Sequence, residues 1–254
     1  MKIAVPVKLV PDLVEELAID ASGESLDYDW LRLKLNELDD HAIEEGLLLK
    51  ERHGGQVAVI ALEDECIDEV LFTASAKGAD RLVKICSRPS RNASNHTLVS
   101  LFAPLIQEIQ PDLVITGVQA HNDLDGSIGP LLAEELGYPY LGYISGIKAD
   151  NGSVTVQKEF PGGLISEMTV KLPAVLGIQS AEAPPRYVAF SKIRQAMKTA
   201  SIEERPGVDV VLAPGATVER MYKPEMGAAA EMVEGPPDLV ADRLVELLKE
   251  LGVI

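Results

Sequence analysis

Strand and helix patterns alternate through the first half of this chain, and that alternation restricts its fold more than any other feature. Short apolar runs at 3–7, 57–62, 81–85 and 113–116 have the length and composition of buried strands. Helical patterns separate them, at 36–53, 67–77 and 98–109, and the first two end at glycines. Repeated winding of this kind predicts an α/β fold, Rossmann-like and doubly wound, with a mostly parallel sheet.

The first helical pattern has a recognisable start. Asn36 precedes it, and Asp39 follows three residues later, a spacing that resembles a capping box. Before it, a turn-rich excursion between Ile19 and Leu26 reads as a small hairpin.

The second half follows a different pattern. Residues 153–158 and 164–171 alternate in polarity around a Phe160–Gly163 turn, which predicts an antiparallel strand pair. Residues 174–178 form a continuous apolar run suited to the interior of a sheet.

The pattern of the last quarter of the chain indicates an extension of the domain rather than part of its hydrophobic core. Residues 199–237 are rich in proline and small residues, and 239–251 form an amphipathic helix. We therefore expect two parts: a nucleotide-binding α/β domain over 1–198, and an extended C-terminal arm with a terminal helix over 199–254. Such an arm more often wraps a partner subunit than decorates a monomer.

Charge and composition exclude several classes of protein. A net charge of −17 argues against nucleic acid and against an anionic membrane surface, and serves either solubility or a partner with a basic docking surface. No apolar run approaches the roughly 20 residues of a membrane span. The chain opens directly on a strand pattern without a signal peptide. We expect a cytoplasmic protein whose cysteines, Cys66 and Cys86, are buried thiols.

No catalytic constellation stands out. The four histidines are scattered without metal-ligand spacing, and Ser145 lacks the preceding glycine of a nucleophile elbow. The sequence favours a binding protein over a catalyst, with no metal.

The most informative segment is 111–130. A buried strand ends at Gly117, a polar loop follows, and a helix begins near Gly126–Ser127. This arrangement points free N–H groups at the crevice where α/β sheets hold nucleotide phosphates. An ordinary βα turn is the alternative, because the strict glycine fingerprint is absent.

Several segments together resemble the electron-transfer flavoprotein β subunit. The similar segments are 2–8 with 10–12, 35–45, 76–81, 117–130, 156–163 with 172–175, 185–187 and 221–225. They span nearly the whole chain in the family's order, and the family's β subunit buries an AMP of structural role.

The resemblance implies which residues bind this cofactor. Backbone groups at Pro6 and Leu62 would flank the adenine. Residues Asn36, Glu37, Leu38 and Asp39 would line the cleft. The loop would contribute Gly117, Gln119, Asn122, Asp123, Asp125, Gly126, Ser127 and Ile128.

The resemblance also implies partners. The family's α subunit holds a redox-active FAD and forms a heterodimer with β, and electrons pass from a donor dehydrogenase to an acceptor oxidoreductase. A docking loop aligns with Ala189, Phe190, Ser191, Lys192 and Ile193, with Phe190 as the anchor. Phe190 could instead pack inward beneath the following helix.

Two other functions remain open. One is a bifurcating subunit that holds its own FAD, although the run 122–125 departs from the Asp-Gly-Asp-Thr typical of those members and so favours AMP. The other is a homodimeric nucleotide-binding sensor or hydrolase on the same fold.

Overall fold

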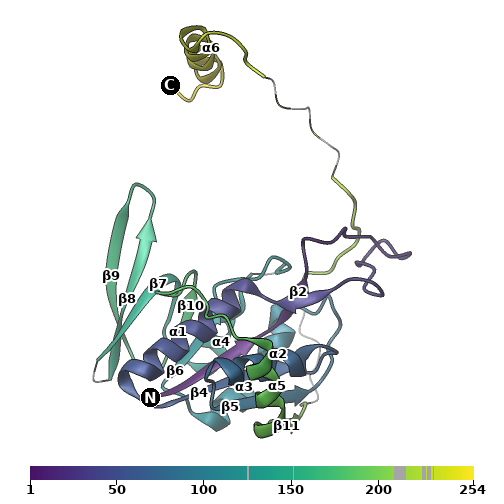
Figure 1. Cartoon of the computed structure of the whole chain (residues 1–254), viewed down its shortest axis with the longest axis vertical. Coiled ribbons are helices and arrows are strands. Elements are labelled where there is room, and N and C mark those ends of the chain that lie inside the picture. The colour runs from purple at the N-terminus through teal and green to yellow at the C-terminus, as the bar shows by residue number, and fades with distance from the viewer. Residues whose placement is uncertain (125, 151, 209–215, 225–226, 228–229, 231) are drawn as a thin grey trace. The chain divides into compact units, whose positions relative to one another are not determined.

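A nine-stranded sheet organises the larger part of the molecule (Figure 1). The computed structural model describes residues 1–254 except 125, 151, 209–215, 225–226, 228–229 and 231. These residues divide into two compact units, Met1–Met221 and Tyr222–Ile254. The sheet lies in the first unit.

The sheet has the order β11-β5-β4-β1-β6-β10-β7-β8-β9. Its strands are β1 (Lys2–Val7), β4 (Gln56–Leu62), β5 (Arg81–Cys86), β6 (Leu113–Gly117), β7 (Tyr140–Asp150), β8 (Ser153–Phe160), β9 (Leu164–Lys171), β10 (Ala174–Ile178) and β11 (Ile202–Pro206). All neighbours from β11 to β7 are parallel, and β7, β8 and β9 form an antiparallel meander. A short antiparallel pair, β2 (Leu9–Pro11) and β3 (Leu33–Leu35), stands apart.

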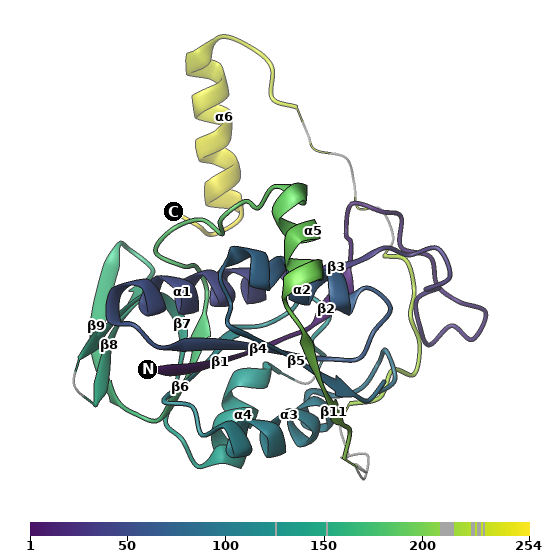
Figure 2. The ribbon, with the colours of Figure 1, turned by 60° about the horizontal axis from the view of Figure 1, so that its bottom comes forward.

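Helices cover both faces of the sheet (Figure 2). The helices α1 (Glu37–His53), α2 (Ile67–Lys77) and α5 (Phe190–Thr199) lie on one face. The opposite face carries α3 (Asn95–Ile109) and α4 (Ile128–Leu136). This is the doubly wound α/β arrangement that the sequence predicts.

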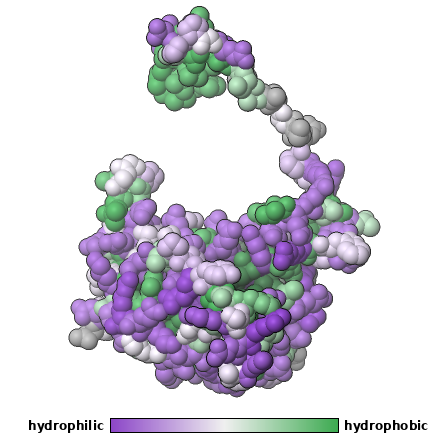
Figure 3. Space-filling model, viewed as in Figure 1, coloured by the Kyte–Doolittle hydropathy of each residue, from purple (hydrophilic) through white to green (hydrophobic). Residues whose placement is uncertain are grey.

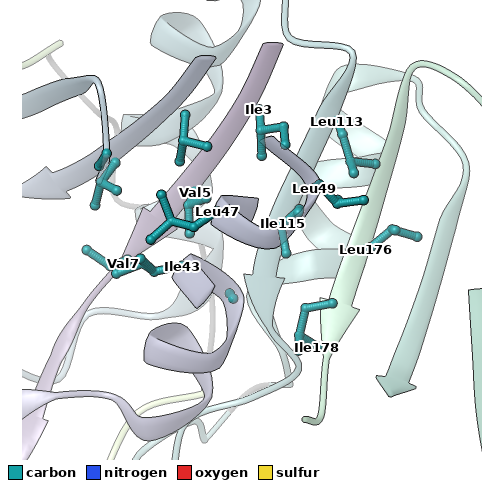
Figure 4. Close-up of a cluster of buried hydrophobic side chains, with 14 of the residues drawn as sticks. Ile3, Val5, Val7, Ile43, Leu47, Leu49, Leu113, Ile115, Leu176 and Ile178 are labelled. Atoms are coloured by element: carbon teal, nitrogen blue, oxygen red, sulfur yellow. The ribbon is translucent and has the colours of Figure 1, made fainter. Parts of the chain in front are cut away.

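The core forms because the central strands are buried on both faces. Alternate residues of β1 point to opposite sides: Ile3, Val5 and Val7 pack towards α1, whereas Ala4 packs towards α3 and α4. Figure 4 shows the first cluster, where side chains of α1 meet those of β1, β6 and β10. Each fully buried Ile or Leu contributes about 1.5–3 kcal/mol, so this stack fixes α1 against the sheet.

The expected strands and helices of the first half are all present, and so is the antiparallel pair, as β8 and β9. An isolated antiparallel bridge joins Ile19 and Leu26, where the hairpin is predicted. Other features differ. The sequence analysis does not predict β7 or the short pair of β2 and β3, and both Cys66 and Cys86 are exposed rather than buried.

The proposed division at residue 199 is wrong for the start of the second part. Residues 202–206 form β11, which pairs in parallel with β5 at the edge of the sheet. Arg81 of β5 reinforces this pairing through two hydrogen bonds to the Glu203 carboxylate, at 2.8 and 3.1 Å. The sheet is therefore complete only with β11, and the compact unit ends at Met221.

Among the described residues of the second unit, the one helix or strand is α6 (Pro237–Glu250). No side chain of α6 is buried, and its apolar residues gather on one side of the helix (Figure 3). The exposed apolar residues are Leu239, Leu244, Val245 and Leu248, followed by Leu251, Val253 and Ile254. Among the described helices, none is both long and apolar enough to cross a membrane.

Two truncations test this organisation. Removing 222–254 should leave thermal unfolding of the first unit nearly unchanged, because the sheet and its helices remain. Removing 199–254 should lower the melting temperature or cause aggregation, because β5 then becomes an exposed edge. Circular dichroism melts of both chains provide the measurement. A 1–198 chain as stable as 1–221 would show that β11 is dispensable.

Candidate functional site

A pocket of about 460 Å³ opens at the carboxyl ends of the central strands, where doubly wound sheets bind ligands. Turns after β1, β4, β5 and β6 line it, with Lys8, 62–64, 88–95 and 121–124. Apolar side chains from the segments that join β1 to α1 close another side: Leu9, Leu13, Leu17, Leu26, Tyr28 and Leu33.

Asp39 fastens the end of β1 to the end of β6 beside this pocket. Its buried carboxylate accepts hydrogen bonds from the backbone N–H groups of Lys8, at 3.0 Å, and Gly117, at 3.1 Å. Only glycine fits at 117, because a Cβ there would lie 2.5 Å from Asp39 Oδ1. Burial raises the pKa of Asp39 to about 6, against the opposing effect of the hydrogen bond from the Lys8 amide.

The loop between β6 and α4 (residues 118–127) is held by further side chains. Asn36 Nδ2 donates to the Gln119 carbonyl at 3.2 Å, and Asn95 Nδ2 donates to the Gly126 carbonyl. Asp123 accepts from the Ala120 amide at 2.7 Å and pairs with Lys8 Nζ. The loop is thus attached to the β1 turn, to α1 and to α3.

The predicted capping box does not form. Asn36 is the N-cap of α1, but its side chain makes no capping hydrogen bond. Asn36 and Asp39 instead bond to Gln119 and to the amides of Lys8 and Gly117. The two side chains that the local pattern predicts to cap the helix therefore make tertiary hydrogen bonds instead.

The charged groups around the pocket are arranged in pairs. The pairs are Lys8 with Asp123, Arg88 with Glu63 at 3.4 Å, and Arg91 with Asp64. The Arg91 guanidinium also lies 5.3 Å from the centre of the Tyr28 ring. Burial, together with Lys34 and Lys8, lowers the pKa of His121, which favours its neutral form.

The structure brings most of the expected cofactor residues to this region. Three line the pocket: Leu62, Asn122 and Asp123. Five belong to the hydrogen-bond network of the loop: Asn36, Asp39, Gly117, Gln119 and Gly126.

The other expected residues that the structure describes do not line the pocket. Pro6 is buried within β1, Leu38 is half-buried beside Gly117, and the exposed Glu37 carboxylate accepts from Lys34 at 3.1 Å. Ser127 and Ile128 begin α4. Asp125 lies outside the described residues.

Two polar features near the pocket are left without a side-chain partner. Asn122 Oδ1 is buried and has no hydrogen-bond partner in the part of the chain that the structure describes. The N-terminus of α4 has no side-chain cap, because Ser127 bonds to the Tyr140 hydroxyl instead. Both features suit a ligand that carries donors and an anionic group.

The sequence analysis misses the pocket residues contributed by the turns after β4 and β5. Glu63 and Asp64 follow β4, and 88–95 follow β5. The carboxyl ends of parallel strands meet at one edge of the sheet. Reading the residues directly after each predicted strand would have identified these two turns.

The expected docking residues lie elsewhere, at the start of α5. Ala189 is the N-cap and Phe190 the first helical residue, with Ser191, Lys192 and Ile193 following. The Phe190 side chain is 57% exposed, and the Arg194 guanidinium lies 4.7 Å from the centre of its ring. Phe190 therefore does not pack inward beneath the helix.

The fold and the pocket define an α/β protein with a pocket at the strand ends, and comparisons with known proteins specify the family. A family model described as "Electron transfer flavoprotein domain" matches residues 31–214. The "Electron transfer flavoprotein subunit beta" of Methylophilus methylotrophus is 31% identical, with 98% of each chain covered. The protein of the same name from Homo sapiens is 28% identical, with 100% of this chain and 99% of the relative covered. The chain belongs to the electron transfer flavoprotein family, and the relatives it matches along nearly their whole length are β subunits.

Replacing Asp39 with Asn tests the link between the pocket and α1. An amide has one acceptor atom, so either Lys8 or Gly117 loses its hydrogen bond, at a cost of about 1–3 kcal/mol for an unsatisfied buried donor. Faster hydrogen exchange of these two amides is the expected result. The exposed Glu69→Gln on α2 is the control.

The same variant tests the shifted pKa. Because the folded-state pKa of Asp39, about 6, lies above the ordinary value of 3.8 for an aspartate, the folded state holds an extra proton between these pH values. This group's contribution to the free energy of unfolding therefore falls as pH rises through that window. Chemical denaturation should give a larger difference in the free energy of unfolding between the parent and Asp39→Asn at pH 5 than at pH 8. The difference should change by at most about 1.4 kcal/mol per pH unit. An equal difference at both pH values would contradict the assignment.

Proposed function

We propose that this chain binds AMP in the pocket, pairs with an FAD-bearing α subunit and serves electron transfer from a dehydrogenase to an acceptor oxidoreductase. The observation that carries the proposal is the pocket at the ends of β1 and β4, flanked by the loop that resembles the family's nucleotide loop. The nearly full-length match to β subunits supports the same function.

The pocket fits a mononucleotide in size and chemistry. Its volume of about 460 Å³ lies within the usual range for small-molecule sites, about 300–1,000 Å³. Apolar side chains such as Leu62 and Phe102 suit a base, and Asn122 Oδ1, which has no partner among the described residues, offers an acceptor. The uncapped start of α4 follows Gly126, and its dipole favours the roughly −1.5 to −2 charges of a phosphate.

In this proposal the chain's own residues orient the nucleotide. Leu62, which lines the pocket, flanks the adenine, and residues 126–128 at the uncapped start of α4 bind the phosphate. Asp39 and Asn36 act through the backbone, because they hold Gly117 and Gln119 in place. The FAD of the α subunit supplies the redox chemistry.

A second FAD in place of AMP and a homodimeric sensor are the competing outcomes. The β chain purified alone should lack visible absorbance, and nucleotide released by acid should chromatograph as AMP. Released FAD would indicate a bifurcating subunit. A stable homodimer that never co-purifies with a flavin-bearing chain would indicate the sensor.

The second unit is proposed to contact the α subunit. The exposed apolar side of α6 needs a receiving surface, and burying it could contribute several kcal/mol at about 25 cal/mol per Å². The 1–221 chain tests this: co-expressed with the α subunit, it should fail to capture its partner. If the 1–221 chain captured the α subunit fully, the second unit would not be part of the interface.

Gly126→Val tests the placement of the nucleotide. Gly126 has φ +98, and no atom lies within 4 Å of a Cβ built there, so the substitution introduces backbone strain without a clash. Strain of about 1–3 kcal/mol should weaken AMP retention roughly 5- to 150-fold. Gly162→Val is the matched control, because Gly162 has φ +82 and equal space but lies in the β8–β9 turn. Equal AMP content in both variants would argue against this placement.

Phe190→Ala tests docking of the donor dehydrogenase. Truncating a central anchor typically costs about 2 kcal/mol or more, which is a roughly thirtyfold weaker encounter. Reduction should slow at limiting protein concentration while the flavin spectrum stays unchanged. Val14→Ala, which removes another exposed apolar side chain, is the control. An unaltered rate would exclude Phe190 as the anchor.

A further inference from the structure

The segment between β10 and α5 (residues 179–189, the crossing segment) has no helix or strand of its own and runs over α1 (Figure 2). Side chains of α1 accept hydrogen bonds from its backbone. The Ala181 amide donates to His41 Nδ1 at 3.2 Å, and the Glu182 amide donates to Glu45 Oε2 at 3.0 Å. The Gln179 and Ser180 amides donate to the Ile144 carbonyl of β7 at 2.9 and 3.3 Å, so the crossing segment is attached to the sheet where it begins and to α1 from Ala181 onward.

The strongest of these attachments is between Arg186 and Glu44. The Glu44 carboxylate accepts from the Arg186 backbone amide at 2.9 Å, from its Nε at 2.9 and 3.0 Å, and from its Nη2 at 2.7 Å. Arg186 Nη1 reaches Glu51 Oε1 at 2.6 Å. The Glu44 side chain is only 3% exposed, so water screens this pair weakly. One carboxylate therefore fixes both the main chain and the side chain of Arg186.

Arg186 lies four residues before Phe190, at the start of α5. Farther along this helix, Ala196 is buried, and α5 packs against α2. Tyr187 and Phe190, by contrast, are largely exposed. The amino-terminal end of α5 is therefore located by two attachments, one to α2 through the helix and one to α1 through Arg186.

We propose that the Arg186–Glu44 pair is a positioning pair that holds the exposed Phe190 end of α5 in one place on the surface. Glu44 is buried whereas Phe190 is exposed, so the pair acts on docking through the position of Phe190. Arginine is required, because its planar guanidinium makes parallel hydrogen bonds that the single ammonium of lysine does not reproduce. The consequence for docking rests on the proposed function, whereas the positioning itself does not.

Hydrogen exchange on the purified complex, or on the full chain if it is isolated alone, tests the positioning. Arg186→Lys keeps the charge and Glu44→Gln keeps the shape, and both lose part of the charge-assisted contact. Opening of 181–191 should become roughly tenfold to a hundredfold more frequent in both variants. Exchange in β1, β4 and β6 should stay at the parental rate.

Arg81→Lys provides the matched control. Arg81 also makes two hydrogen bonds to one carboxylate, that of Glu203, and the two side chains are 28% and 35% exposed. This variant should leave exchange in 181–191 unchanged. Unchanged exchange in Arg186→Lys, or faster exchange spread evenly over the sheet, would overturn the positioning role.

Kinetics with the donor dehydrogenase test the consequence for docking. Arg186→Lys should raise the KM for this protein and leave kcat, AMP content and the flavin spectrum unchanged, in parallel with Phe190→Ala. If Phe190→Ala itself has no effect, the docking proposal fails and the exchange result still decides the positioning role. If Phe190→Ala raises the KM and Arg186→Lys does not, the pair does not govern docking.

Discussion

The buried carboxylate of Asp39 is the interaction on which the candidate site depends. It accepts the amide that follows β1 and the amide at the end of β6, and it belongs to the first turns of α1. Three elements that are far apart in sequence therefore meet at one side chain. The cost of burying the group appears in its pKa of about 6, and the structure tolerates this cost because both oxygens are hydrogen-bonded.

Helix α1 joins the candidate site and the crossing segment because it packs against the middle of the sheet. Its apolar side packs on β1, β6 and β10, which fixes the helix rigidly (Figure 4). Its start holds the β6–α4 loop through Asn36 and Asp39. Its centre holds the crossing segment through His41, Glu44 and Glu45. Acidic and polar residues that look like a solvated helix face are in fact partners for the backbone of other segments.

Glu45 is a buried acidic residue on the side of α1 that contacts the crossing segment. The side chain is fully buried, and burial raises its pKa to about 7 against the hydrogen bond that it accepts from the Glu182 amide. Its other oxygen, Oε1, has no hydrogen-bond partner among the described residues. A buried carboxyl of this kind is costly, and here it positions a connection that has no secondary structure of its own.

Much of the fold follows from local pattern. Strand-length apolar runs and helix-spaced apolar faces predicted the doubly wound sheet, and alternating polarity around Phe160–Gly163 predicted β8 and β9. The local pattern did not predict the edge strand β11, because its sequence, Ile-Glu-Glu-Arg-Pro at 202–206, lacks an apolar face. Its place is decided by pairing with β5 and by the Arg81–Glu203 contact. Neither is visible in a window of neighbouring residues.

The candidate site was also predicted from the sequence only in part. The sequence determined that a polar loop follows β6 and precedes a helix, because turn residues at 117–127 separate two apolar patterns. It could not determine that Asn36 and Asp39 leave the helix end to bind Gln119, Lys8 and Gly117, nor that Arg186 is held by Glu44. Helix capping is a local competition, whereas these bonds form only after the sheet brings distant amides within reach. The sequence by itself determined the central strands and helices and their order, whereas the tertiary structure decided the edge strand β11 and which polar groups meet, because hydrogen-bond partners are determined by distance in space.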